Sequence, residues 1–458
     1  MKKEKLIQLH HLRQYFPVKK EHLFDKTQLY VKANDGIDIT IHAGETYGLV
    51  GESGCGKSTL GRVLLQLYEQ TRGNTIYYGR TIYEYQPSYV EKDIKNLAKL
   101  KADYEKAKAD INPNDPNHTS ADKADYKFQK AARTAGALLY DADLSTASSL
   151  LLEEYHAGCK VADLKKKNAS ENEINAAIQV QDNLRKKIAD RKKNLLTNEE
   201  AQRADACWDG GIDLTQLRKE EIRRLREDLQ IIFQDPYSSL NPRLTVGQII
   251  SEPLVGQGKF KKGSQELENY ILEIMGKCGL EPYFIHRYPH QFSGGQRQRI
   301  GIARALALNP KFIVCDEAVS ALDVSIQSQV LNLLQDLKEQ QNLTYLFISH
   351  DLSVVKYISD RIGVMYLGNM VESAKTEDIF RNPLHPYTEA LLNAIPTTDV
   401  HNKELQILDG DIPSPVNPPK GCKFHTRCKY ATQRCKEEIP KWTEIEPEHF
   451  VACHLRSK

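Results

Sequence analysis

Residues 51–58 read Gly-Glu-Ser-Gly-Cys-Gly-Lys-Ser and combine three residue types that can bind phosphate. The glycines let the backbone turn closely, so that its N–H groups and the N-terminus of a following helix can point at phosphate oxygens. Lys57 adds a positive charge for the β- and γ-phosphates, and the Ser58 hydroxyl can ligate Mg²⁺. An apolar strand before the loop and an amphipathic helix after it make a mere strand–helix turn the weaker interpretation. The residues predicted to bind the nucleotide here are Gly51, Glu52, Ser53, Gly54, Cys55, Gly56, Lys57, Ser58 and Thr59.

Two carboxylates follow a second apolar strand. In "KFIVCDE", four apolar residues precede Asp316 and Glu317. A carboxylate at a strand end beside a phosphate loop can hold Mg²⁺, usually through water, and this role suits Asp316. Glu317, one residue on, can orient or deprotonate an attacking water. Acidic strand ends are also common surface features, and the phosphate loop is what favours the catalytic interpretation.

A second glycine turn, "SGGQ" at 293–296, opens an Arg-rich helical pattern. Adjacent glycines at the start of a helix expose backbone N–H groups and so form another anion site. Because the chain already has one phosphate loop, the second site is expected to serve a nucleotide bound by a neighbouring subunit. The alternative is a glycine loop that caps an ordinary helix.

Strands and helices alternate around the phosphate loop, which indicates an α/β fold with a parallel core. Residues 6–50 alternate apolar and polar positions between turn signals, as is typical of an antiparallel β subdomain. Helices are expected over 262–280 and 325–341. We expect this region to close near residue 375 and to be followed by a Pro-rich segment with little regular structure.

Composition excludes several classes of protein. At 458 residues the chain is long enough for two or three domains. A formal net charge of +2 argues against binding dominated by nucleic-acid phosphates. No apolar run approaches the roughly 18–20 residues that cross a bilayer, and the basic N-terminus lacks the apolar core of a signal peptide. We therefore expect a cytosolic chain that reaches a membrane only through a partner.

Taken in order, these motifs resemble those of the ATPase subunits of ABC transporters. The resemblance implies a P-loop NTPase fold, the ABC ATPase cassette, with an antiparallel β subdomain and a helical subdomain. It covers nearly everything outside residues 81–207. Its motifs are a Walker A loop at 51–58, a Q-loop at Gln234, a signature at 293–296, a Walker B strand ending at Asp316 and Glu317, a D-loop ending at Asp323 and a switch histidine at His350.

The resemblance also implies which groups act on ATP. Lys57 and the loop amides stabilise charge on the transferred phosphoryl group, Glu317 positions the attacking water, and His350 senses the γ-phosphate. Mg²⁺ is expected on Ser58, Gln234 and Asp316.

In this family, the signature of one subunit faces the Walker A ATP of another. An aromatic residue near the N-terminus stacks on adenine, and Phe16 is the nearest match, with Tyr15 as the alternative. An aromatic at this position can equally belong to the core of the β subdomain. The residues implied to complete the partner's site are Ser293, Gly294, Gly295 and Gln296.

Three further segments resemble the oligopeptide/dipeptide-permease branch: 233–243, 382–396 and the cysteine-rich tail. This resemblance implies an importer of oligopeptides or dipeptides; some relatives carry nickel or glutathione. It implies a homologous ATPase partner, with a heterodimer favoured and a homodimer left open. Two membrane permease subunits and, indirectly, an extracytoplasmic peptide-binding protein complete the expected assembly on the cytoplasmic face of the membrane. Phe292 stands where the family usually has Leu.

Residues 81–207 form a charged insert with thin apolar stripes at helical spacing, for which we expect a solvated helical hairpin. A helical arm is also found in chromosome-maintenance and DNA-repair ATPases. Two arms of about 60 residues would reach at most roughly 90 Å, however, and sustained heptads are absent. A translation-factor ATPase normally has two cassettes, whereas one Walker A occurs here. The expected domains are a cassette at 1–80 and 208–375, the insert at 81–207, and a C-terminal extension at 376–458.

Four cysteines crowd the C-terminus: Cys422, Cys428, Cys435 and Cys453. Their intervals of five, six and seventeen residues lack the C-x₂-C pairs typical of structural zinc sites. Four thiolates from a loop-rich segment can surround a [4Fe–4S] cluster, and the tail resembles that of dipeptide-permease ATPases, some of which carry one. We expect this cluster; Zn²⁺, a disulfide pair and free thiols are the alternatives.

Overall fold

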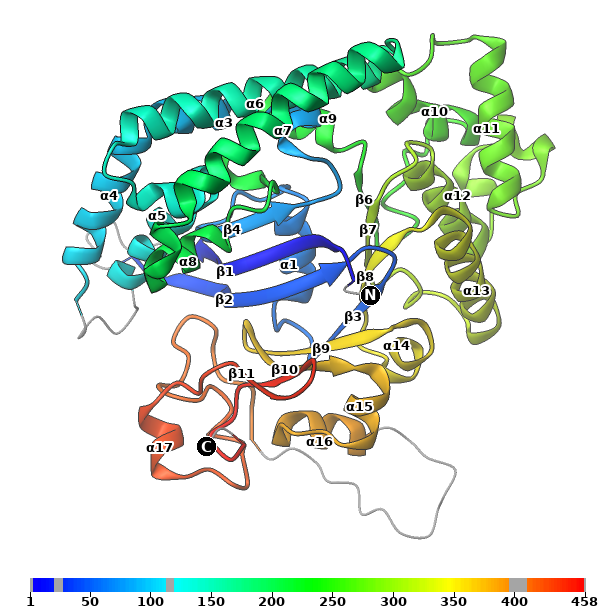
Figure 1. Ribbon diagram of the computed structural model, residues 1–458. Coiled ribbons are helices and arrows are strands. Elements are labelled where there is room, and N and C mark those ends of the chain that lie inside the picture. The colour runs from blue at the N-terminus through cyan, green and yellow to red at the C-terminus, as the bar shows by residue number, and fades with distance from the viewer. Residues whose placement is uncertain (1–2, 20–27, 113–118, 395–409, 457–458) are drawn as a thin grey trace. The chain divides into compact units, whose positions relative to one another are not determined.

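The computed structural model describes residues 3–19, 28–112, 119–394 and 410–456 (Figure 1). The chain divides into two compact units. The first unit consists of Met1–Lys5, Leu12–Thr71 and Arg223–Lys458. The second consists of Leu6–His11 and Arg72–Ile222. Strand β1 (Lys5–Pro17) belongs to both.

The strands of the large sheet in the first unit are β3 (Thr46–Val50), β6 (Leu229–Ile232), β7 (Phe312–Asp316), β8 (Thr344–Ile348), β9 (Arg361–Tyr366), β10 (Asn369–Lys375), β11 (Thr443–Glu446) and β12 (His449–Val451). Their order is β11-β12-β10-β9-β3-β8-β7-β6, and the five strands from β9 to β6 are parallel. Every residue of β3, β7, β8 and β9 is buried, as expected of parallel strands covered on both faces. The predicted parallel core is thus confirmed.

Strand register fixes where the functional loops begin. Leu49 of β3 and Asp316 of β7 both pair with Ile348 of β8. Since parallel strands end at the same edge, the segments after all three strands lie together at the carboxyl edge of the sheet.

Helices α10 to α16 of the first unit contribute to one large buried cluster. Helices α12 and α13, whose bounds follow, lie side by side (Figure 1). No helix in the described ranges is long and apolar enough to cross a bilayer. The helices are α1 (Lys57–Leu64), α10 (Val246–Gly256), α11 (Gln265–Lys277), α12 (Gly294–Leu306), α13 (Val324–Gln341), α14 (Leu352–Ile358), α15 (Thr376–Arg381), α16 (Pro386–Asn393) and α17 (Gln433–Glu437).

A second sheet confirms the predicted antiparallel subdomain. It contains β1 together with β2 (Tyr30–His42), β4 (Arg72–Tyr77) and β5 (Ile212–Asp213), and the strand order is β2-β1-β4-β5. Strands β4 and β5 pair antiparallel, with Ile76 opposite Asp213.

The expectation that the cassette domain closes near residue 375 was wrong, because β11 and β12 of the C-terminal extension join the large sheet. The Pro-rich segment after residue 375 contains helix α16, and residues 395–409 lie outside the described residues. Strand β12 pairs with β10, so that Val451 lies opposite Glu372. The fully buried Glu372 carboxylate lies 2.8 Å from His449 Nε2 and accepts hydrogen bonds from the backbone N–H groups of Leu384 and His385. This buried polar network ties the end of the chain to the central sheet.

The expectation of one solvated hairpin at 81–207 was wrong. Seven α-helices occur in the described part of the insert, and they bury a cluster that includes Leu97, Leu138 and Leu151. Alanines such as Ala131 and Ala135 allow the helices to approach closely, so thin apolar stripes suffice for a core. The helices are α2 (Ile82–Tyr85), α3 (Ser88–Lys95), α4 (Leu97–Ala109), α5 (Thr119–Ala135), α6 (Leu144–Lys166), α7 (Glu171–Lys192) and α8 (Glu199–Asp205).

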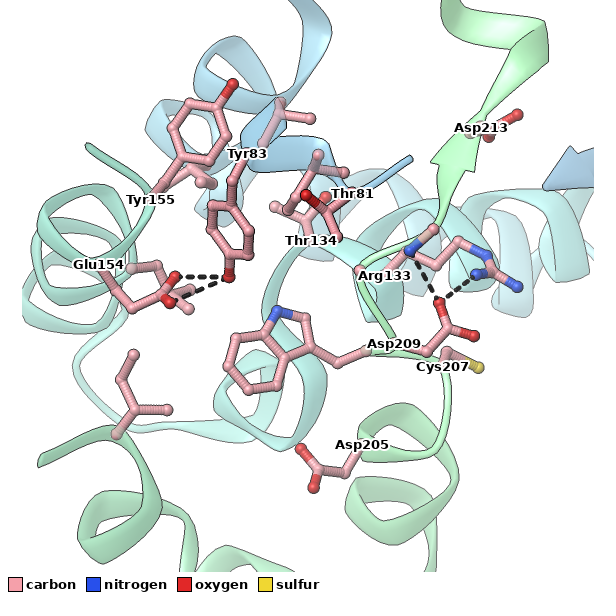
Figure 2. Close-up of a pocket in the computed structure, with 18 of the residues that line it drawn as sticks. Thr81, Tyr83, Arg133, Thr134, Glu154, Tyr155, Asp205, Cys207, Asp209 and Asp213 are labelled. Carbon is pink, nitrogen blue, oxygen red and sulfur yellow. Dashed lines mark hydrogen bonds and ion pairs between the residues drawn. The ribbon is translucent and has the colours of Figure 1, made fainter. Parts of the chain in front are cut away.

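A cavity of about 600 Å³ lies within the second unit (Figure 2). Several of its charged lining residues pair with one another. The Glu154 carboxylate accepts from Arg185 Nε at 2.9 Å and from the Tyr83 hydroxyl at 3.0 Å, as Figure 2 shows for Tyr83. Lys192 Nζ lies 2.6 Å from Asp205. These pairs explain how a carboxylate and an ammonium group that are almost fully buried are accommodated here.

The insert is proposed to be dispensable for the cassette fold. We expect a chain that lacks residues 81–207, with a short turn joining Arg80 to Trp208, to fold and bind ATP. The ends of the insert are adjacent, because the Ile82 N–H donates to the Gly210 carbonyl at 3.3 Å, and the core of the insert is made of its own residues. Thermal unfolding and ATP titration of the deletion variant measure folding and binding. A deletion variant that is insoluble, or that does not bind ATP, would contradict the prediction.

Candidate functional site

The phosphate loop joins β3 to α1 and adopts backbone angles that require glycine. Gly51 and Gly56 have φ values of 149° and 103°. A Cβ atom at these positions would lie 2.2 Å from the Met365 carbonyl oxygen and 2.1 Å from the Ala33 carbonyl oxygen. No side chain fits there, so the glycine spacing follows from close backbone packing as well as from phosphate binding.

Lys57 is nearly buried within the loop that it is predicted to serve. Its Nζ donates to the carbonyl oxygens of Gly51 at 2.7 Å and Glu52 at 3.0 Å. It also lies 3.7 Å from the sulfur of Cys55, and burial raises the pKa of that thiol. Ser53 and Gly54 are exposed at the loop tip. The ammonium group is therefore held at the loop, where it can meet phosphate oxygens.

Oxygen ligands suited to Mg²⁺ meet where α1 faces the end of β7. The Ser58 hydroxyl donates to Asp316 Oδ1 at 2.5 Å, and Asp316 is buried. Arg62 Nη2 lies 3.5 Å from Asp316 Oδ2. A hydroxyl and a carboxylate are the hard oxygen donors that Mg²⁺ prefers, so these residues fit the ion.

Two of the predicted residues, Gln234 and His350, converge on the carboxylate of a third, Glu317. Gln234 Nε2 donates to Glu317 Oε2 at 2.8 Å, and His350 Nδ1 lies 3.3 Å from the same oxygen. Glu317 has a left-handed φ of 49°, and its N–H donates to the Ile348 carbonyl oxygen at 3.0 Å. The end of β8 thus holds Glu317 where its side chain stays partly open between the Q-loop and the switch histidine.

The signature caps α12. The Ser293 hydroxyl accepts from the Gln296 N–H at 3.3 Å, and the Gln296 side chain accepts from the Ser293 N–H at 3.1 Å. A Cβ on Gly295 would lie 2.2 Å from Ile326 of α13, whereas Gly294 has ordinary space. Within the described ranges, no hydrogen bond or ion pair joins 293–296 to residues 51–59.

The remaining predicted residues have structural partners. Asp323 caps α13 by accepting from the Ile326 N–H at 3.1 Å. The Phe16 ring packs edge-on against Tyr68, with 5.4 Å between the ring centroids. The Tyr15 hydroxyl donates to Asp35 at 2.5 Å. Adenine stacking stays a prediction for both aromatics.

A backbone hydrogen bond brings two of the four C-terminal cysteines, Cys422 and Cys435, together. Burial raises the pKa of Cys422 to about 11, and the charges of Cys435, Cys453 and Cys428 contribute to the rise. The Cys422 N–H donates to the Cys435 carbonyl oxygen at 2.8 Å. The donor chemistry suits a metal or an iron–sulfur cluster, although no group of three or more His, Cys, Asp or Glu side chains in the described residues is arranged to hold a metal ion.

Sequence reasoning missed the residues of the extension that contact the phosphate loop. The Tyr387 hydroxyl accepts from the Glu52 N–H at 2.9 Å, and Arg427 pairs with the Glu52 carboxylate. Tyr387 lies in the segment 382–396, and the family resemblance of that segment was the one feature of the sequence that could have pointed to it. No local pattern marked Arg427.

Comparison with known proteins identifies the class. A family model described as ABC transporter matches residues 34–189 and 192–320, so the chain belongs to the ABC transporter ATP-binding proteins, which hydrolyse ATP to ADP and phosphate for transport. A second model, described as the C-terminal region of oligopeptide/dipeptide transporters, matches 371–435 and defines the branch within that class.

Two relatives support the assignment along different lengths of the chain. The oligopeptide transport ATP-binding protein AppF of Bacillus subtilis is 38% identical over 457 residues, which is 99% of this chain and 98% of that protein. The oligopeptide transport ATP-binding protein OppF of Salmonella typhimurium is 53% identical over 246 residues, 53% of this chain and 73% of that protein.

The arrangement around Glu317 predicts the effect of one substitution. Glu317→Gln keeps an oxygen that can accept from Gln234 but removes the base, so ATP binding should persist while hydrolysis falls by about 10²–10⁴-fold. ATP titration and phosphate release measure the two effects. Glu339→Gln, at an exposed position on α13, is the matched control. Wild-type turnover by Glu317→Gln would remove Glu317 from this role.

Proposed function

We propose that this chain is the ATP-hydrolysing subunit that powers an importer of oligopeptides or dipeptides. The observation that carries the proposal is the relationship to AppF over 99% of the chain, because AppF is named for oligopeptide transport. The 371–435 match to the oligopeptide/dipeptide transporter region supports the same substrate class. Nickel and glutathione are the alternative cargoes.

Each residue of the site has a role in this proposal. Lys57 and the N–H groups of the phosphate loop bind and orient the triphosphate of ATP. Mg²⁺, held by Ser58, Asp316 and Gln234, would neutralise charge on the β- and γ-phosphates. Glu317 takes or orients the proton of the attacking water, and His350, which shares the Glu317 oxygen, contacts the γ-phosphate.

The active assembly is proposed to contain two cassettes. Ser293 and the N–H groups of Gly294 and Gly295 would contact the ATP of a homologous partner subunit, and Asp323 would lie beside the partner. Residues 234–243 would transmit closure to two permease subunits and place the chain at the cytoplasmic face of the membrane. Tyr237, two-thirds exposed and stacked on Arg297 of the signature helix at 4.8 Å, suits such a contact.

The substrate class is tested by reconstitution of the native complex. We expect this chain to co-purify with permease subunits, and vesicles of that complex to take up a labelled oligopeptide only with ATP and the binding protein. Replacing Lys57 with Ala should abolish uptake, because the phosphate contact is lost. Uptake of nickel or glutathione in place of peptide would contradict the proposed cargo.

For the cysteine cluster we propose a [4Fe–4S] centre on Cys422, Cys428, Cys435 and Cys453. Four cysteines from one loop-rich segment support it, since four thiolates are the usual donor set for such a cluster. We expect anaerobically purified protein to be brown and to contain close to four irons per chain, and Cys435→Ser to lower the iron content. One zinc per chain in a colourless preparation would favour the tetrahedral alternative; metal-free protein would support free thiols.

A further inference from the structure

The side chain of Glu52, the second residue of the phosphate loop, is held by an arginine from the C-terminal extension. Arg427 Nη1 donates to Glu52 Oε2 at 2.9 Å, and Arg427 Nη2 donates to Glu52 Oε1 at 3.0 Å. The Arg427 side chain is 6% exposed and that of Glu52 is 21% exposed. Two parallel hydrogen bonds with little access to water make this a geometrically specific pair, unlike the exposed ion pairs elsewhere on the surface.

The backbone of the same residue is held as well. The Glu52 N–H donates to the Tyr387 hydroxyl at 2.9 Å, and the Glu52 carbonyl oxygen accepts from Lys57 Nζ at 3.0 Å. Glu52 is therefore connected to the extension at two points and to the phosphate-binding lysine at a third. A displacement of Glu52 would carry with it the carbonyl group to which the Lys57 ammonium is bonded.

Arg427 is itself fixed by packing. It follows the buried Phe424, to whose carbonyl oxygen its N–H donates at 3.0 Å. The Phe424 ring lies within 5.3 Å of the rings of Tyr366 and Tyr387, measured between centroids. The Arg427 guanidinium lies 5.9 Å from the Tyr366 ring. Few rotamers are left to Arg427, so the pair with Glu52 forms at little cost in side-chain entropy.

A second contact anchors the same segment. Lys423 Nζ donates to Asp35 Oδ2 at 2.9 Å. Burial acts to raise the pKa of Asp35, but Lys423 and the hydrogen bond from Tyr15 outweigh it and hold that pKa at about 2. Two ion pairs thus tie the segment 423–427 to β2 and to the phosphate loop, and only the one at Arg427 touches the loop.

We propose that Arg427 is a positioning residue for ATP binding: it holds Glu52, and through Glu52 the backbone of the phosphate loop, in the conformation that receives the phosphates. This inference rests on ATP binding at residues 51–58. Without the pair, the loop would have to be ordered by ATP itself, which lowers the affinity for ATP. Once ATP is bound the loop is ordered again, so the rate at saturation is spared.

The test compares Arg427→Ala with wild type in the assembled transporter. We expect the KM for ATP to rise about tenfold, the size of effect that a charge-assisted hydrogen bond has on a binding constant, while kcat changes by less than about twofold. ATP titration of the isolated full chain should show the same loss. Arg434→Ala, which removes an exposed pair between Arg434 of α17 and Glu438 just beyond that helix, is the matched control and should bind ATP as wild type does.

A double-mutant cycle separates positioning from a general loss of stability. Glu52→Gln removes the same pair from the loop side, so it should raise the KM similarly, and its combination with Arg427→Ala should add little. Glu52→Gln also carries the test if Arg427→Ala does not fold. The charge swap Glu52→Arg with Arg427→Glu should recover part of the affinity.

The proposal is overturned if both single variants keep the wild-type KM, or if their effects add fully. A lowered melting temperature with an unchanged KM would likewise overturn it, because it would show a structural role alone. Lys57→Ala, measured alongside, distinguishes a failure of the proposed ATP site from a failure of the proposed role of Arg427. If Lys57→Ala abolishes ATP binding while Arg427→Ala does not weaken it, the ATP site stands and only the role of Arg427 falls.

Discussion

The site depends on the parallel register of β3, β7 and β8. Because Leu49 and Asp316 both lie opposite Ile348, the phosphate loop and the two carboxylates leave the sheet at the same edge. The Ser58 hydroxyl then reaches Asp316 at 2.5 Å, and Glu317 reaches Gln234 and His350. A shift of one residue in any of these strands would turn their side chains to the opposite face of the sheet and separate these groups.

The sequence predicted the parts of this arrangement that local chemistry determines. A glycine-rich loop between an apolar strand and a helix is a local pattern, and so is an apolar strand that ends in two carboxylates; the structure places both as predicted. The meeting of Gln234, Glu317 and His350 was expected only from family resemblance, because it depends on strands distant in sequence. The left-handed backbone conformation of Glu317 could not be predicted, because glutamate as a residue type does not favour a positive φ.

The misjudged elements are those whose packing is non-local. The insert was expected to be a solvated hairpin because its apolar residues are few, yet small alanines let its helices bury a core. The cassette domain was expected to close near residue 375, but β12 joins the central sheet and a buried His449–Glu372 contact fixes it there. Composition shows how many apolar residues a segment has but not how closely they pack.

The segment between Cys422 and Cys428 also carries Lys423 and Arg427. These two residues connect the cysteine-rich segment to β2 and to the phosphate loop.

The central claim is that Ser58 and Asp316 form the metal-binding side of an ATP site. It is tested most directly by titrating ATP into the wild-type chain, Ser58→Ala and Asp316→Asn, each with and without Mg²⁺. The account predicts that Mg²⁺ tightens ATP binding to the wild type, and that both variants lose this gain while their metal-free affinity is unchanged. An equal gain from Mg²⁺ in all three proteins would contradict the account.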